Sequence, residues 1–387
     1  MARHHVFLSP GMFGFGKLGS YVYFAHVERE LAARFAAAGH DLVPHIIEDL
    51  PTASIRRRAR RLAELVATTP GDAGDAIHLL GHSTGGLDAR LVASPATRDL
   101  PAEHTRWLPR LRSVTTMNTP HFGTPLVSFF ATSQGQRVLA ALSLLTMVGL
   151  SLGAQPLAAA SVLLGFVRNT DRTLPFKSAL LDRSLASVVS LVDDARSPEI
   201  RRFVAAIEDD QGSMLQLSPE AMDLVAAGFA DRPGVAYQST VSSAPPPRAR
   251  RFLSQVTQPW RNVSLSLFYA LHKLTSNGNP RYPCAAMQGD VALRDPAIEA
   301  VLARAFGSAP GLDANDGIVP LRSQLWGRVI WAGVADHLDV LGHYTGAPGG
   351  AGELAHRDWL VSGSAFDDRA FAALCDAIAA GMLAAAT

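Results

Sequence analysis

The chain has 387 residues, of which 48% are hydrophobic and 18% charged, and its formal net charge is +1 at pH 7. This near-neutral balance argues against a nucleic-acid-binding protein and against a basic surface that binds anionic membranes. The length fits one elaborated domain or two smaller ones, and the two cysteines, Cys284 and Cys375, are too few for a disulfide framework. A single disulfide between them stays open at this point.

The first 120 residues alternate between strand-like and helix-like segments. The pattern predicts helices at 21–39, 54–69 and 86–94, and strands at 5–10, 41–47, 76–82 and 111–120. Strands that alternate with helices form a parallel sheet with both faces covered. Within the second helix, the basic run 56–61 is interpreted as a solvated face.

The second half of the chain begins with a long helical region. Residues 125–232 are almost entirely helix-like, strand character returns at 234–243, and segments 316–320 and 327–340 complete the sheet-like part before an amphipathic helix at 366–385. The economical interpretation is one α/β domain over 1–387, with a helical lid or cap insertion at 125–205 and a smaller insertion at 244–283.

Two features bear on location. The uncharged run 138–167 is long enough to cross a membrane, but Gly149, Gly153, Gln155 and Pro156 interrupt it, which favours two short apolar helices and no integral span. The chain starts with a strand-like segment and without the apolar stretch of a signal peptide. The default expectation is a cytoplasmic protein, and secretion by another route or from a trimmed chain stays open.

The segment HLLGHSTGGLDARL at 78–91 places a serine between two glycines, directly after a strand and before a helix. Gly-X-Ser-X-Gly in this setting is the nucleophile elbow of α/β-hydrolases, in which a strained turn exposes the serine hydroxyl. Ser83 is therefore the candidate nucleophile. Its neighbour His82 is interpreted as a core or supporting residue.

A serine nucleophile needs a histidine base and an acid, which follow in the order Ser, Asp or Glu, His along such chains. His337 follows the predicted strand RVIWAGV and so lies at the carboxyl edge of the sheet, where catalytic loops gather. Asp316, in the turn-rich segment DANDGIVP, is the candidate acid that orients the imidazole. The rival acids are Asp313 and Asp336, and the other late histidines are His272, His343 and His356, of which the last two are expected at the surface.

The oxyanion site needs two backbone N–H donors near Ser83. One is expected from Thr84, the residue after the nucleophile. The other is expected from Met12, in the loop SPGMFGFG after the first strand, where Gly11 lets the backbone turn closely.

Four segments in chain order carry a resemblance: PGMFGFG followed by YVYF, GHSTGGLDAR, MNTPHFGTP, and NDGIVP with DHLD, and the segment SMLQLSPEAMDL adds a weaker match. Together they resemble the calcium-dependent true lipases of bacteria, within the α/β-hydrolase superfamily, over nearly the whole chain except 125–205 and 244–283. The resemblance implies the α/β-hydrolase fold, the triad Ser83, Asp316 and His337, and the oxyanion donors Met12 and Thr84.

The resemblance also implies a structural calcium ion and no organic cofactor. Asp295, in LRDP, and Asp339, two residues after the histidine, occupy the positions of the family's calcium-binding aspartates, and backbone carbonyls at His343 and Ala347 would complete the oxygen shell. This chain departs from the family in having Pro10 before Gly11 where His-Gly is usual. Proline removes an N–H and fixes φ, so the preference for the acyl group is expected to differ.

The expected reaction is hydrolysis of carboxylic esters through an acyl-enzyme, with a lipase acting on acylglycerols as the first hypothesis. The apolar segment 125–205 would cover the cleft and bind transiently at a lipid interface. The alternatives are a carboxylesterase acting on shorter or synthetic esters, a phospholipase, and a non-catalytic lipid-binding relative.

Overall fold

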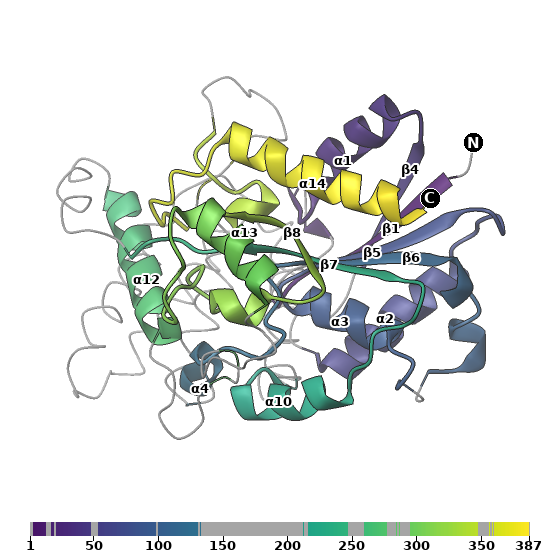
Figure 1. Ribbon diagram of the computed structural model, residues 1–387, viewed down its shortest axis with the longest axis horizontal. Coiled ribbons are helices and arrows are strands. Elements are labelled where there is room, and N and C mark those ends of the chain that lie inside the picture. Colours follow the sequence, from purple (N-terminus) through teal and green to yellow (C-terminus); the bar gives the residue numbers. More distant parts are fainter. Residues whose placement is uncertain are drawn as a thin grey trace, which may run out of the picture.

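The computed structural model describes residues 3–12, 17–18, 21–47, 53–97, 100–130, 132, 212, 216–246, 259–276, 284, 286, 295–346, 356, 358 and 360–386. Its centre is a six-stranded sheet in the order β4-β1-β5-β6-β7-β8, and every neighbouring pair is parallel (Figure 1). The strands are β1 Arg3–Ser9, β4 Asp41–Ile46, β5 Ala76–His82, β6 Leu111–Met117, β7 Ala236–Ser242 and β8 Arg328–Gly333. A separate antiparallel pair joins β2 Lys17–Leu18 to β3 Tyr21–Val22.

Helices cover both faces of the sheet. Helices α1 (Ala25–Ala37) and α14 (Asp368–Ala386) lie on one face, and α2 (Ile55–Thr68) and α3 (Thr84–Ala93) lie on the other (Figure 1). The remaining helices are α4 Leu126–Phe130, α10 Pro219–Gly228, α12 Pro259–Ser276 and α13 Pro296–Phe306, and the short 3-10 turns are η1 Ala102–His104, η2 Leu108–Arg110, η5 Leu321–Gln324 and η6 Asp339–Leu341.

The burial of β5 shows why the sequence forms this sheet. All seven residues of β5 are buried, which is expected for a central strand of a parallel sheet with helices on both faces. On α2, Ile55, Ala59, Leu62 and Val66 recur at helical spacing and turn one apolar face inward. The same face carries Arg58, which is only 1% exposed, so the interpretation of the basic run as a uniformly solvated face is wrong at this position.

The α/β-hydrolase architecture expected from the sequence is confirmed, and the predicted strands and helices of the first 120 residues all occur. One segment differs: residues 316–320 form a turn closed by a single bridge between Asn315 and Pro320, because the carboxylate of Asp316 accepts the N–H groups that a strand would use. The chain 133–205 of the expected lid, including the uncharged run 138–167, lies outside the described residues.

Among the described residues, α14 is long and apolar enough to cross a membrane by length and composition. Its apolar side chains instead pack into the core between the sheet and α1, where Phe371, Leu374, Ile378 and Met382 are buried. Burial against the sheet therefore accounts for the hydrophobicity of this helix.

Candidate active site

The candidate site lies at the carboxyl edge of the sheet. Five neighbouring strands end there, and the loops that follow β1, β5, β6, β7 and β8 carry Gly11, Ser83, Asn118, Ala244 and His337 respectively. The carboxyl edge of a parallel sheet is where binding and catalytic loops gather in α/β folds.

Ser83 occupies a strained turn between β5 and α3. Its φ of 54° and ψ of −127° are rarely adopted by residues other than glycine, and its N–H donates to Met117 O at 2.8 Å. The flanking glycines are required by close approach, because a Cβ on Gly81 would lie 2.2 Å from Gly85 C and one on Gly85 would lie 2.0 Å from Ser9 O. The sequence therefore forms the elbow that presents Ser83 at the edge of the sheet.

The structure brings His337 and Asp316 together. His337 Nδ1 lies 2.7 Å from Asp316 Oδ2, and the His337 N–H donates to Asp316 O at 3.0 Å. Since a carboxylate can only accept, Nδ1 carries the proton and Nε2 is left as the basic nitrogen. The rival carboxylates lie elsewhere: Asp313 is exposed, and Asp336 Oδ1 accepts from the N–H groups of Leu338 and Asp339.

The carboxylate of Asp316 is completely buried and surrounded by donors. Oδ1 accepts from the N–H groups of Ile318 (2.9 Å) and Val319 (2.7 Å). Oδ2 accepts from Asn118 Nδ2 (2.9 Å) and Gln324 Nε2 (3.3 Å) in addition to His337. These donors compensate for burial of the charge and fix the direction in which the acid faces the imidazole.

Helix α12, which comes from the predicted 244–283 insertion, packs against the loop that carries Asp316. Thr275 Oγ1 donates to Gly317 O at 3.0 Å, and Asn315 Nδ2 donates to Ser276 Oγ at 2.9 Å. The buried ring of Phe268 lies against Gly317, where an added Cβ would come within 2.5 Å of the ring. The described part of this insertion therefore supports the loop that carries Asp316.

The predicted oxyanion residues lie beside the elbow. Gly11 approaches Ser83 so closely that a Cβ on it would lie 2.7 Å from Ser83 Cβ. Thr84 is the first residue of α3, so its N–H is one of the helix donors without an intrahelical acceptor. The half-buried side chain of Met12 packs against a buried apolar cluster that contains Leu87.

A hydrogen-bonded chain links the oxyanion loop to the histidine loop. His82 Nε2 lies 2.9 Å from His337 O, so this nitrogen is the donor and Nδ1 accepts from Tyr23 Oη at 2.7 Å. Tyr23 Oη in turn accepts from the Gly11 N–H at 3.2 Å. Burial, with His337 adding a smaller contribution, holds the pKa of His82 well below its usual value, so the ring is neutral and keeps these roles.

Arg58 supports the same loop from the opposite side. Its guanidinium lies 2.8 Å from Asp88 Oδ2 and also donates to Pro10 O. Asp88 Oδ2 accepts from Ser9 Oγ at 2.9 Å as well. Sequence reasoning missed Arg58, although its place on the buried face of α2, one turn before Leu62, was a signal that could have identified it.

Three of the four predicted calcium ligands, Asp295, Asp339 and His343, lie in the described residues. Asp295 is exposed and caps α13, where its Oδ1 accepts from the Ala297 N–H at 2.8 Å. Asp339 is buried and accepts from Ser364 Oγ at 2.6 Å and from the Asp336 N–H at 2.8 Å. Among the described residues, no three His, Cys, Asp or Glu side chains are arranged to hold a metal ion, and Ala347 lies outside them.

Two expectations about histidines are corrected. His343 is 3% exposed and not a surface residue, and His356 is partly buried, where its ring stacks on His26 at 4.2 Å between centroids. Burial raises the pKa of both Asp336 and Asp339; the Asp358 carboxylate raises that of Asp336 further, and the Asp336 carboxylate raises that of Asp339 further. Two neighbouring buried carboxyl groups favour a shared proton or a bound cation, even with the hydrogen bonds that each accepts.

No protein-family model matches the chain, and no curated protein matches it in sequence. Solved structures do resemble it. Lipase 1 from Pelosinus fermentans has a TM-score of 0.51 at 16% identity, over 98% of this chain and 99% of that one. EstA from Clostridium botulinum has a TM-score of 0.49 at 17% identity, over 94% and 87% of the two chains. Staphylococcus hyicus lipase has a TM-score of 0.48 at 14% identity, over 100% and 97%. At such identities the likeness to lipase 1 establishes the fold, and the chemistry has to be argued from the site.

Proposed function

We propose that this protein is a serine carboxylic-ester hydrolase, and more narrowly a lipase that releases fatty acids from acylglycerols. One observation carries the proposal: Ser83 stands on a strained turn at the carboxyl edge of the sheet, and the ring of the adjacent His82 lies 4.7 Å, between centroids, from His337, whose Nδ1 lies 2.7 Å from a buried aspartate. A φ of 54° at a serine costs free energy, and it is expected where a nucleophile must be exposed.

The proposed reaction has two halves, formation of an acyl-serine and its hydrolysis. His337 Nε2 takes the hydroxyl proton as Ser83 Oγ attacks the ester carbonyl carbon, and the N–H groups of Met12 and Thr84 stabilise the oxyanion. The tetrahedral intermediate collapses to an acyl-serine, and the imidazolium gives its proton to the leaving alcohol. A water molecule, deprotonated by the same nitrogen, then attacks the acyl-serine, and the carboxylic acid leaves as the imidazolium returns the proton to Ser83 Oγ. Asp316 holds the imidazole in the required tautomer throughout.

An apolar substrate is favoured by the surroundings of the oxyanion loop. Met12 is half-buried and packs against a buried apolar cluster that includes Ile55, Leu87, Val127 and Met222, so the oxyanion loop borders apolar side chains. The similarity of fold to lipase 1 from Pelosinus fermentans is consistent with an ester substrate. The second candidate keeps the same chemistry on shorter or synthetic esters, or on phospholipids.

Hydrolysis of p-nitrophenyl esters from acetate to palmitate tests both candidates. Wild-type protein should cleave the long-chain esters, and Ser83→Ala should lose at least about a thousandfold in kcat. Thr84→Ala is the matched control, because it changes the neighbouring hydroxyl and retains the backbone donor. Activity confined to the short esters would favour the carboxylesterase. Failure of a fluorophosphonate to label Ser83 would contradict the serine hydrolase and leave a non-catalytic relative.

Calcium at Asp339 is the second part of the proposal. When bound, the ion would neutralise the buried carboxylates that follow His337 and would brace the histidine loop. Asp295, which caps α13, and the backbone carbonyls of His343 and Ala347 are the other proposed ligands. EDTA should lower the melting temperature of wild-type protein, and excess Ca²⁺ should restore it. A melting temperature that ignores both reagents would contradict the calcium site.

A further inference from the structure

A group of histidines surrounds β1. Of the 13 histidines in the chain, five lie on β1 or on the segments that flank it: His4, His5, His40, His45 and His78. His4 and His5 belong to β1, His45 to its neighbour β4, and His78 to β5 on the other side. His40 directly precedes β4. The reaction proposed above uses none of these rings.

Four of the five histidines join β4, the edge strand, to β1. His4 and His5 are consecutive on a strand, so their side chains point to opposite faces of the sheet. His4 Nε2 lies 3.1 Å from His40 Nδ1, and His5 Nδ1 lies 2.9 Å from His45 Nε2. We call these two imidazole–imidazole hydrogen bonds the histidine clamp, which fastens β4 to β1 on both faces.

On the face of His4, further rings and a hydroxyl group continue inward from the clamp. His4 Nδ1 lies 3.1 Å from His78 Nε2, and His78 Nδ1 lies 2.8 Å from Ser113 Oγ. Phe35 of α1 packs edge-on against His4, with 5.2 Å between the ring centroids. The positive charge of Arg112 acts on His78 from β6. A proton added on this face therefore meets other imidazoles and an arginine.

On the face of His5, the clamp borders a carboxylate. His5 Nε2 donates to Asp75 Oδ2 at 3.2 Å, and the Arg110 guanidinium lies 3.8 Å from the same oxygen. The ring of Phe7 stacks on His45 with 4.6 Å between centroids. Since Asp75 is already paired with His5 and Arg110, the second ring of this half, His45, faces a hydrocarbon ring and another imidazole.

The clamp depends on the protonation state of its rings. A hydrogen bond between two imidazoles needs an N–H on one ring and a lone pair on the other, so it forms when at least one of the rings is neutral. When both rings are protonated, two N–H groups face one another and the two positive charges repel. Each half of the clamp is therefore lost when its second ring takes up a proton.

The surroundings of the clamp oppose that second proton. Burial lowers the pKa of His4 and of His45 from the usual value of 6.5. The facing rings lower it further, His40 for His4 and His5 for His45, whereas the Asp75 carboxylate acts in the opposite direction on His4. Because the pKa is lower in the folded chain than in the unfolded chain, the closed clamp stabilises the fold above pH 6.5 and loses this contribution as the pH falls.

The remaining attachment of β4 is that of an edge strand. It pairs with β1 alone, and all of its residues after the first are only half-buried. Pro44, in the strand, has no N–H to donate. Leu42 and Ile46 pack partly against the core, and the exposed ion pair between Asp41 and Arg3, at 3.5 Å, is of a kind that contributes little. Loss of the clamp should therefore weaken β4 more than any other strand of the sheet.

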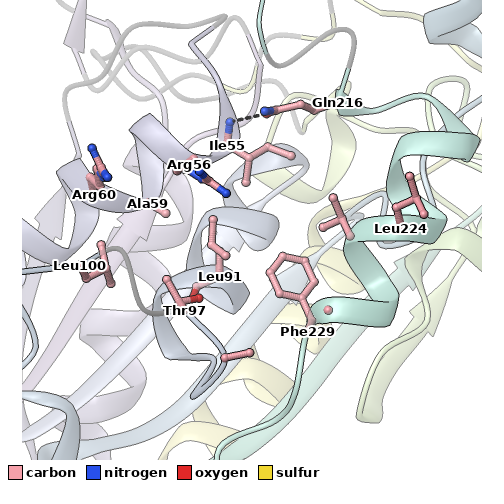
Figure 2. A pocket seen from close by; sticks show the side chains of 13 residues that line it. Ile55, Arg56, Ala59, Arg60, Leu91, Thr97, Leu100, Gln216, Leu224 and Phe229 are labelled. Carbon is pink, nitrogen blue, oxygen red and sulfur yellow. Dashed lines mark hydrogen bonds between the residues drawn. The ribbon is translucent and has the colours of Figure 1, made fainter.

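Helix α2, the next helix after β4, has attachments that the clamp does not touch. The Ile55 N–H donates to Gln216 Oε1 at 2.8 Å, and both residues line an apolar groove of about 460 Å³ between α2, α3 and α10 (Figure 2). On the buried face of α2, the Arg58 guanidinium lies 2.8 Å from Asp88 Oδ2. Release of β4 should therefore leave α2 in place.

We propose that the histidine clamp is an acid-sensitive fastening. Near neutral pH it holds β4 against β1, and in mildly acidic solution both rings of each pair are protonated and β4 separates from β1 while β5, β6 and β7 stay paired. This device lies outside the triad and does not depend on the proposed function.

Backbone hydrogen exchange followed by mass spectrometry tests the proposal. Exchange is measured at about pH 7.5 and about pH 5, on either side of the ordinary histidine pKa, and each rate is divided by the intrinsic rate at that pH. Protection of residues 41–47 should fall roughly 10- to 100-fold at the lower pH, the range expected when two hydrogen bonds are lost. Protection of β6, β7 and α2 should be the same at both pH values.

The double variant His40→Gln/His45→Gln removes the titration but can keep the bonds. A glutamine amide can donate or accept at any pH, so it can pair with His4 or His5 in either protonation state. Protection of residues 41–47 should then be nearly equal at both pH values. His104→Gln, at a partly exposed histidine in η1, is the matched control and should keep the wild-type response.

The single variant His40→Gln changes only an exposed ring and should remove part of the response, so it serves as the test if the double variant does not fold. Three results would overturn the inference: equal protection of β4 at both pH values in wild type, the same acid-induced loss in His40→Gln/His45→Gln, or a simultaneous loss in β6 and β7. The last result would mean that acid unfolds the whole sheet and does not release its edge.

Discussion

The loop that carries Asp316 and the loop that carries Met12 both lie at the carboxyl edge of the sheet but are held in different ways. The Asp316 carboxylate accepts from two backbone N–H groups and from Asn118 and Gln324, and α12 closes over the loop. The oxyanion loop is held by Tyr23 at the Gly11 N–H and by Arg58 at Pro10 O.

The two loops show two ways of placing catalytic groups before the substrate binds. The acid must keep a full charge away from water, so many donors converge on it and the loop becomes part of the folded core. The oxyanion donors are backbone N–H groups that need only correct placement, which two side-chain contacts supply. Changes at the acid loop should therefore affect both stability and rate, whereas changes behind the oxyanion loop should act mainly on rate.

The largest effect is expected from Asp316→Asn. The amide keeps the shape but removes the charge that selects the His337 tautomer, so kcat for p-nitrophenyl butyrate should fall roughly ten-thousand-fold. Asp313→Asn, at the exposed rival carboxylate three residues earlier, should retain activity. If the two variants lose activity equally, the acid has been assigned to the wrong residue.

Phe268→Ala tests whether α12 stabilises the acid loop. Deleting this fully buried ring beside Gly317 should lower the free energy of unfolding by about 3–5 kcal/mol and reduce activity with it. Tyr269→Ala, its neighbour on the same helix and 42% exposed, is the control and should cost about 1 kcal/mol or less. Urea denaturation of both variants measures the two losses of unfolding free energy. Similar losses would argue against stabilisation of the Asp316 loop by Phe268.

Tyr23→Phe should act on rate. It removes the acceptor of the Gly11 N–H and the donor to His82, so kcat should fall roughly 10- to 100-fold while KM changes little. Tyr237→Phe is the matched control and should keep the wild-type kcat. The Tyr237 hydroxyl also accepts a backbone N–H, from Arg232 at 3.0 Å, but it lies at the amino end of β7, away from the candidate site. A rise in KM with unchanged kcat would show that Tyr23 serves substrate binding and not the oxyanion loop.

The smallest effect concerns acid stability, which should arise at the opposite edge of the sheet. Burial, with smaller contributions from His4 and Arg112, lowers the pKa of His78 to about 3 from 6.5. Below pH 6.5 the unfolded chain therefore binds a proton that the folded chain excludes. The free energy of unfolding should fall by about 1.4 kcal/mol per pH unit on acidification from this group alone.

The variant His78→Gln removes this titration and should flatten the slope between pH 6.5 and 4.5 in chemical denaturation. His104→Gln, a partly exposed histidine in η1, should keep the wild-type slope. Equal slopes in wild type and His78→Gln would place the origin of acid sensitivity elsewhere, such as in the catalytic loops.

The order of elements could be predicted because the relevant patterns are local. β5 is predicted and found at 76–82, since a short apolar run between turn residues defines it, and the Gly-His-Ser-Thr-Gly turn follows from the close contacts of Gly81 and Gly85. Ser83, Asp316 and His337 could be nominated because the carboxyl ends of parallel strands converge and their order along the chain is restricted.

The supporting residues could not be predicted because their roles depend on distant parts of the chain. In the sequence, nothing in the basic run 56–61 distinguishes Arg58 by residue type from its neighbouring arginines. Only the packing of α2 on the sheet brings Arg58 into contact with Asp88 and Pro10. Asn118 donates to Asp316 across 198 positions of sequence, and its φ of 48° becomes evident only in the structure.

The sequence by itself determined the sheet, the elbow and the candidate nucleophile, acid and base, because hydrophobic periodicity and steric limits on a turn act over a few residues. The tertiary structure decided which donors surround the acid, how Tyr23 and His82 join two loops, and that α2 and α10 enclose an apolar groove. These features depend on contacts between residues that are distant in the sequence, and such contacts form only when the chain folds.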